Sequence, residues 1–292
     1  MNYDAFSKRH PVVNFLFFAG AVGAGVVIQH PMYLFAGAVT GAAYYLLLNG
    51  KKGWKTILGF LPLFVFLTVI NPLFNIYGAT PLFRLFGRPY TFEALLYGAV
   101  IAAMFVNMML WFGCYNKVMT GDKFTSLFGN WIPSLSLLLV MVFRMVPGLI
   151  QKAAQITGAR RSIGKGAGES ASNKEKVFDG MTVLGALTSW ALEGSVVTGD
   201  SMRARGCGTA KRSSFMIYRL TAADRQLLAM MLVLMALTII AACLGQVSST
   251  FTPILSVARI SWGVIPYTAY LLIPTALHIK EAVQWRISRS KI

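Results

Sequence analysis

Long apolar runs separated by short polar segments make up most of the chain. Six of these runs approach the ~20 residues that an α-helix needs to cross a lipid bilayer. We therefore expect an all-α, polytopic integral membrane protein with about six transmembrane helices. The predicted spans cover approximately residues 12–28, 32–49, 56–71, 93–113, 226–245 and 262–279.

The first apolar run follows Lys8, Arg9 and His10, an arrangement that a signal peptide also has. No cleavage-site pattern separates this run from the second one, so we interpret it as the first transmembrane helix.

A seventh, weaker run at 132–150 carries Arg144 and Pro147. If this run crossed the bilayer, Arg144 would lie in hydrocarbon at a cost of a few kcal/mol or more. The basic cluster in residues 151–225 would also move to the other side of the membrane. We therefore place this run as a helix at the cytoplasmic boundary. It should bend at a hinge at Pro147, because proline removes a backbone donor and clashes with the preceding turn.

Charge supports this membrane topology. Only 13% of the residues are charged, against about 25% in a typical soluble domain. With the N-terminus in the cytoplasm, every Lys and Arg except Arg84, Arg88 and Arg259 lies on the cytoplasmic side, as the positive-inside rule requires. Both termini are then cytoplasmic, and the net charge of +17 needs no nucleic-acid partner.

The spans divide the chain into three parts. Residues 1–131 hold four transmembrane helices, 132–225 form a cytoplasmic region, and 226–292 hold the last two spans and a basic tail. The cytoplasmic region has two helical stretches, from Pro147 to Ser162 and from about Phe178 to Arg205. Residues 163–176 between them are rich in Gly, Ser and charge, which predicts an exposed loop. In the second stretch, four apolar residues share one face at a helical period, namely Met181, Leu184, Leu187 and Ala191.

Both helical stretches end in arginine. The first ends in Gly158-Ala159-Arg160-Arg161-Ser162 and the second in Arg203-Ala204-Arg205-Gly206. A terminal arginine complements the helix dipole, and a following glycine suits the left-handed residue that closes many helices. The same pattern fits a second reading, in which each guanidinium enters an acidic groove of a partner, since its planar fork binds carboxylates bidentately. Spacing alone does not decide between the two readings.

A wider set of motifs resembles one known family. The set comprises NPLFN with the following GATPLF in 71–83, TFEALLYG in 91–98, FRMVPGLIQKAAQITGAR in 143–160 and SMRARGCG in 201–208. Together they resemble the transmembrane T subunit of energy-coupling factor (ECF) transporters, the family of CbiQ-like cobalt-transport permeases.

The resemblance implies a non-catalytic scaffold in the cell membrane of a prokaryote. Such a subunit joins a membrane-embedded, substrate-binding S subunit to two cytoplasmic ABC-type ATPases, for uptake of a vitamin or a metal ion. Two long coupling helices end in Ala-Arg-Gly motifs that dock into the ATPases. No catalytic residue, metal or cofactor is then expected in this chain itself.

Carried over by position, the first docking motif is Ala159-Arg160 and the second is Ala204-Arg205-Gly206. The first motif departs from the family pattern, because Arg161 stands where glycine is usual. Whether Arg160 or Arg161 docks is open at this point.

Two other classes of function compete with the scaffold. A self-contained carrier or channel usually buries polar groups near the bilayer midplane, and the predicted spans have few. A polytopic membrane enzyme needs clustered acids or a nucleophile–base pair, and the ten acids are scattered. Runs of Gly and Ala at 19–25 and 36–43 allow close approach of helices, either inside the bundle, which we favour, or against an S subunit.

Overall fold

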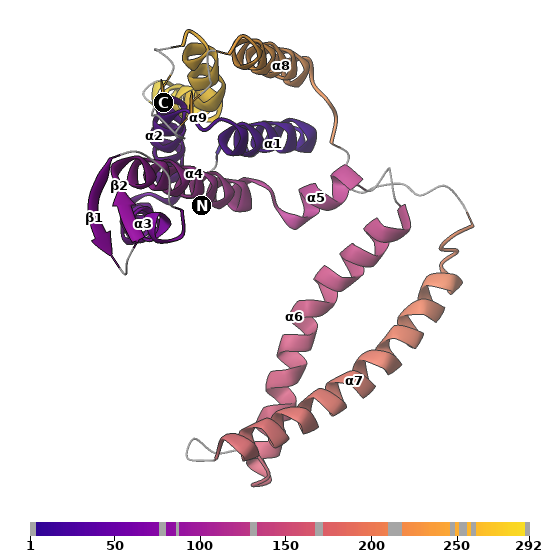
Figure 1. Ribbon diagram of the computed structural model, residues 1–292. Helices are drawn as coiled ribbons and strands as arrows, with labels where there is room; N and C mark the ends of the chain where they lie inside the picture. The colour runs from indigo at the N-terminus through magenta and orange to yellow at the C-terminus, as the bar shows by residue number, and fades with distance from the viewer. Residues whose placement is uncertain are drawn as a thin grey trace. The chain divides into compact units, whose positions relative to one another are not determined.

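The computed structural model describes residues 4–75, 80–85, 88–128, 133–166, 172–209, 218–245, 249–250, 256–257 and 261–289 (Figure 1). Residues 76–79 of the family-like motif, residues 167–171 of the predicted loop and Arg259 lie outside these ranges.

Helices dominate the described chain, with two short antiparallel strand pairs. In order, the elements are α1 (Pro11–Val27), α2 (Pro31–Asn49), α3 (Lys51–Phe74), β1 (Pro81–Leu85), β2 (Arg88–Thr91), α4 (Phe92–Val118), α5 (Gly121–Phe128), α6 (Pro133–Ser162), α7 (Asn173–Ala204), α8 (Ala222–Cys243), β3 (Ser249–Thr250), β4 (Ser256–Val257) and α9 (Val264–Arg289). Contacts divide the chain into a bundle unit, residues 1–120 with 218–292, and a hairpin unit, residues 121–217. We describe each unit by itself.

Local sequence sets where several helices begin. The helices α1 and α2 each start with proline at the first helical position, where its missing N–H costs nothing. The preceding histidines cap them: His10 Nδ1 accepts from the Val12 N–H at 3.2 Å, and His30 Nδ1 from the Met32 N–H at 3.3 Å. These two histidines therefore have a structural role at helix starts.

Among the described residues, five helices are long and apolar enough to cross a membrane. They are α2, α3, α4, α8 and the segment Leu137–Ser162 of α6, and α1 is a shorter apolar helix. Many of their large apolar side chains are exposed, as on α3, where only Gly53 and Pro72 are buried. Exposed apolar surface on this scale is typical of contact with lipid. The chain is thus an all-α, multi-pass membrane protein.

Two segments differ from the expected spans. Most of the sixth expected span, 262–279, lies in α9, which is not among the five apolar helices. Its polar and charged residues, such as Tyr267, Tyr270, Lys280 and Glu281, lower its mean hydropathy. By contrast, α6 has the length and composition to cross, although the sequence placed residues 132–150 at the cytoplasmic boundary. That boundary position stays a prediction.

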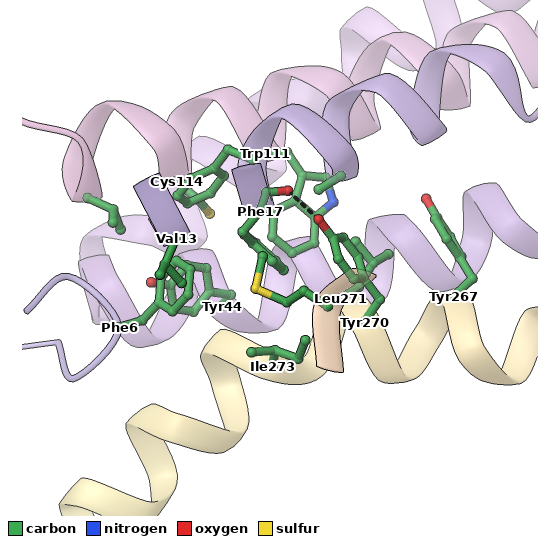
Figure 2. Close-up of a cluster of buried hydrophobic side chains, with 14 of the residues drawn as sticks. Phe6, Val13, Phe17, Tyr44, Trp111, Cys114, Tyr267, Tyr270, Leu271 and Ile273 are labelled. Atoms are coloured by element: carbon green, nitrogen blue, oxygen red, sulfur yellow. Dashed lines mark hydrogen bonds between the residues drawn. The ribbon is translucent and has the colours of Figure 1, made fainter. Parts of the chain in front are cut away.

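The core of the bundle unit is aromatic (Figure 2). The Phe17 ring of α1 stacks on Tyr270 of α9 with ring centroids 5.1 Å apart, and it meets Trp111 of α4 edge-on at 5.6 Å. The Tyr270 hydroxyl donates to the Phe17 carbonyl at 2.9 Å. Large rings with a satisfied polar tip bring much apolar contact to a core, and here they join the first and last helices of the chain.

Glycines let the helices of the bundle unit approach closely. A Cβ added at Gly37 of α2 would lie 2.8 Å from Asn107 Nδ2, and one at Gly41 would lie 3.1 Å from Trp111 Nε1. A Cβ at Gly25 of α1 would lie 3.0 Å from Asn107 Nδ2. These glycines of the two Gly/Ala runs thus pack inside the bundle, as favoured from the sequence.

The tightest approach to backbone predicts a measurable loss of stability. A Cβ at Gly98 of α4 would lie 2.8 Å from the Thr68 carbonyl oxygen of α3, so Gly98→Ala forces the helices apart. We expect a loss of roughly 1–3 kcal/mol, the usual cost of overpacking. The matched control is Gly59→Ala in α3, where an added Cβ meets nothing within 4 Å. Thermal unfolding in detergent should show a lower Tm for Gly98→Ala than for the wild type and an unchanged Tm for Gly59→Ala. Equal Tm values for the two variants would contradict the close packing at Gly98.

Ionic contacts fix residues 4–9 onto the bundle unit. The buried Asp4 carboxylate accepts from the Tyr44 hydroxyl of α2 at 2.5 Å and lies 3.1 Å from His278 Nδ1 of α9. Two further pairs join Lys8 to Glu281 at 2.6 Å and Arg9 to Asp224 at 3.3 Å. The chain before α1 is therefore tied to α2, α8 and α9.

The strand pair β1–β2 is a feature that hydropathy did not predict. These strands form an antiparallel ladder between α3 and α4. The Tyr90 hydroxyl donates to the Val69 carbonyl of α3 at 2.9 Å, and burial raises the pKa of this hydroxyl. This strand pair therefore folds back against α3.

Candidate docking ends of two long helices

The helices α6 and α7 form an antiparallel pair in the hairpin unit (Figure 1). Arg160, near the end of α6, pairs with Asp179, near the start of α7, at 2.6 Å. Further along, Lys152 Nζ lies 5.7 Å from the ring centroid of Trp190. Going backwards along α6, these contacts go forwards along α7, so the two arginine-bearing ends lie at opposite ends of the pair.

The start of α7 is set by a capping box. The Ser172 side chain accepts from the backbone of Glu175, and the Ser172 N–H donates to Glu175 Oε2 at 3.0 Å. The reciprocal bonds satisfy two N–H groups that the helix itself leaves open. Because of this cap, the helix begins at Asn173, and the loop predicted over 163–176 was too long.

The end of α7 is a complete Schellman motif. Gly206 has a positive φ of 73°, which glycine adopts without a Cβ penalty. Its N–H donates to the Arg203 carbonyl at 2.9 Å, and the Cys207 N–H donates to the Met202 carbonyl at 3.0 Å. This is the bond pattern that closes helices at a left-handed glycine, so the predicted terminating role of Gly206 is confirmed.

The end of α6 has the same motif, at a different place from the one that the sequence indicated. Gly164 has a φ of 71°, and its N–H donates to the Arg161 carbonyl at 3.0 Å. The Lys165 N–H donates to the Arg160 carbonyl at 3.0 Å. The closing glycine of α6 is therefore Gly164, three residues beyond Arg161, and not the residue directly after Arg160.

Arg160 is held between the two helices. Its Nε and Nη2 atoms lie 2.7 and 2.6 Å from Asp179 Oδ1, and Nη2 donates to the Lys165 carbonyl at 3.2 Å. Only 22% of the Arg160 side chain and 15% of the Asp179 side chain are exposed. The guanidinium thus binds a carboxylate of its own chain.

Arg161 differs from its neighbour. It is exposed and forms no ion pair with a described residue. A Cβ added at Gly166 would lie 2.7 Å from Arg161 Cγ, so the turn after the helix lies against the stem of this side chain. Its charged end is left to solvent.

Arg205 borders a cavity of about 440 Å³ between the first half of α6 and the last turns of α7. Arg144 lines the same cavity, and neither arginine has an ion-pair partner among the described residues. The other lining residues are Leu137, Val140, Met141, Thr198, Ser201 and Met202. Arg203 is exposed and does not line the cavity.

Large apolar side chains are exposed along the pair. No residue of α7 is buried, and Met181 and Leu184 of the expected apolar face are 66% and 63% exposed. Helix α6 continues without interruption through Pro147, from Pro133 to Ser162. The hinge at Pro147 stays a prediction, while the exposed apolar face calls for lipid or a partner.

The described residues contain no group of three or more His, Cys, Asp or Glu side chains able to hold a metal ion. Comparison with protein-family models and with curated proteins found no match.

Two features of the ends were missed from sequence, for different reasons. The terminating role of Gly164 was visible as a glycine shortly after an arginine-rich last turn. Asp179 as the partner of Arg160 had no local signal, because the two meet only when α7 folds back along α6.

Proposed function

We propose that this protein is the transmembrane T subunit of an ECF-type ABC importer. One observation supports the proposal above the others. Two arginine-bearing helix ends with the same Schellman closure lie at opposite ends of one antiparallel pair. Together with the family-like motifs, this gives the chain two similar basic tips on rigid helices.

The separation of the tips suits two partners better than one. Arg205 lies level with Leu137, and Arg160 lies roughly 35 Å further along α6 at 1.5 Å per residue. A single acidic groove would not reach both tips. Two ABC-type ATPases can take one tip each, and their ATP-driven closure would then move both ends of the pair.

The exposed apolar side chains of the hairpin unit support the other part of the proposed scaffold role, which is contact with an S subunit. Exposed side chains such as Val142, Leu184 and Val196 can contact a membrane-embedded S subunit as well as lipid. Motion of the tips would pass along α6 and α7 to that subunit, which binds a vitamin or a metal ion. In this arrangement the chain lies in a prokaryotic plasma membrane with both termini in the cytoplasm.

One observation favours a second candidate, a self-contained carrier. The side-chain amide of Asn14 and the side-chain oxygen of Asn107 are buried with no hydrogen-bond partner among the described residues. Unpaired polar groups inside a membrane bundle are a feature of substrate pathways. This candidate gives no role to the two arginine tips.

Reconstitution distinguishes the two candidates. The purified chain alone in liposomes should move none of a panel of labelled vitamins and transition-metal ions. The same chain purified with its ABC-type ATPases and S subunit should import one of them on addition of ATP. Uptake by the chain alone would reject the scaffold role in favour of the carrier.

A further inference from the structure

The cavity of about 440 Å³ in the hairpin unit is lined by two matching helix faces. Each face has residues at positions i, i+3, i+4 and i+7, which share one side of a helix. On α6 these residues are Leu137, Val140, Met141 and Arg144, and on α7 they are Thr198, Ser201, Met202 and Arg205. Each face therefore ends in an arginine.

The antiparallel arrangement puts the two arginines at opposite ends of this cavity. Because α6 and α7 run in opposite directions, Arg144 lies level with Thr198, and Arg205 lies level with Leu137. The step from Leu137 to Arg144 covers about 10 Å along the helix axis at 1.5 Å per residue. The cavity thus has one guanidinium group for each of its two ends.

The positive charge of these arginines is not balanced by the described part of the chain. No Asp or Glu lines the cavity, and neither Arg144 nor Arg205 forms an ion pair with a described residue. Arg160 of the same helix pair is different, because it binds Asp179. The two arginines of the cavity are therefore available to an anion from outside the chain.

Apolar side chains surround the two cations. Four of the lining residues are Leu, Val or Met, and beside them on α6 the side chains of Leu138, Val142 and Phe143 are exposed. Exposed apolar surface on a membrane protein is suited to lipid chains. A ligand with an anionic head and apolar chains therefore fits this place better than a free anion does.

We propose that this cavity binds the headgroup of a phospholipid that has two phosphate groups, as cardiolipin does. Arg144 binds one phosphate and Arg205 binds the other, each through the planar fork that matches two phosphate oxygens. The acyl chains lie along the exposed apolar side chains of α6. Two phosphates balance the two cations at the two ends of the cavity, whose volume is that of a typical ligand pocket.

The predicted topology agrees with this ligand. It places residues 132–150 at the cytoplasmic boundary, and basic pockets between helices on the cytoplasmic side of membranes bind headgroups of this kind. The bound lipid would join the start of α6 to the last turns of α7. Among the described residues, no ion pair joins the two helices at this end of the hairpin unit.

The test measures lipid binding to the full chain, purified in detergent, by native mass spectrometry. Cardiolipin is compared with phosphatidylglycerol, which has one phosphate, and with inorganic phosphate. The variant Arg144→Ala with Arg205→Ala is compared with Arg161→Ala with Arg203→Ala, which removes the same charge from exposed arginines outside the cavity.

We expect the wild type to bind cardiolipin more tightly than the other two ligands. The first variant should lose about tenfold in cardiolipin affinity per arginine, or about 100-fold together, while the control binds as the wild type does. Both variants should keep the Tm of the wild type, because the replaced side chains have no ion-pair partner among the described residues.

Unchanged cardiolipin affinity of the first variant would overturn the proposal, and so would an equal loss in the control, which would follow from net charge alone. Equal affinity of the wild type for phosphatidylglycerol or inorganic phosphate would overturn the assignment of a lipid with two phosphates. If the first variant kept its cardiolipin and lost a co-purifying ATPase, Arg205 would belong to a protein interface instead. The proposed function does not depend on these lipid measurements, because they use this chain by itself.

Discussion

Replacing Ser189 by proline should abolish transport by the assembled complex while ATPase stays bound. Ser189 lies in the middle of α7 and is exposed, so the change removes no packing. Proline deletes the backbone bond to Gly185, and its ring clashes with that carbonyl, at a cost of about 3 kcal/mol or more. The tip at Arg205 then moves independently of the start of α7. Uptake of the panel of labelled vitamins and metal ions into proteoliposomes measures the effect.

Ser189→Ala is the matched control, because alanine keeps the backbone bond and favours the helix. It should transport as the wild type does. If Ser189→Pro also transported normally, transmission of ATPase motion through a rigid α7 would be wrong.

The largest expected effect on stability follows from Asp4. Asp4→Ala leaves the fully buried Tyr44 hydroxyl without its acceptor and removes the partner of His278. A buried donor left without its partner costs about 1–3 kcal/mol, and the Phe6 and Ser7 N–H groups lose the same carboxylate. We therefore expect a large drop in the Tm of the purified protein in detergent and release of residues 4–9 from the bundle unit.

Two controls accompany this variant. Asp4→Asn keeps an oxygen acceptor for Tyr44 and should cost about 1 kcal/mol, while Asp122→Ala removes an exposed carboxylate of α5 and should cost little. A Tm for Asp4→Ala equal to that of Asp122→Ala would show that the Asp4 contacts do not stabilise the bundle.

Hydropathy was sufficient to locate the helices of the bundle unit. The expected span at 32–49 corresponds to α2 at Pro31–Asn49, and the span at 93–113 lies within α4 at Phe92–Val118. These positions follow from run length and from local start signals such as Pro31 and the Thr91 cap. Hydropathy did not predict the β1–β2 pair, because its strands are short and short apolar runs do not distinguish strands from helices.

The ends of α6 and α7 show where local sequence is insufficient. The end of α7 could be predicted directly from Ala204-Arg205-Gly206, because the closing glycine immediately follows Arg205. In α6 the helix continues to Ser162 and closes at Gly164, so matching Ala-Arg in both motifs compared different positions. Asp179 is 19 residues from Arg160, and their pairing depends on the antiparallel fold of the hairpin unit.

The mass of the intact complex tests the central proposal most directly. The full-length chain, tagged and purified from its native membranes in mild detergent, is measured by native mass spectrometry. The scaffold role predicts one species that contains this chain, two ABC-type ATPases and a membrane-embedded S subunit. A preparation that contains only this chain, alone or with further copies of itself, would contradict the proposal.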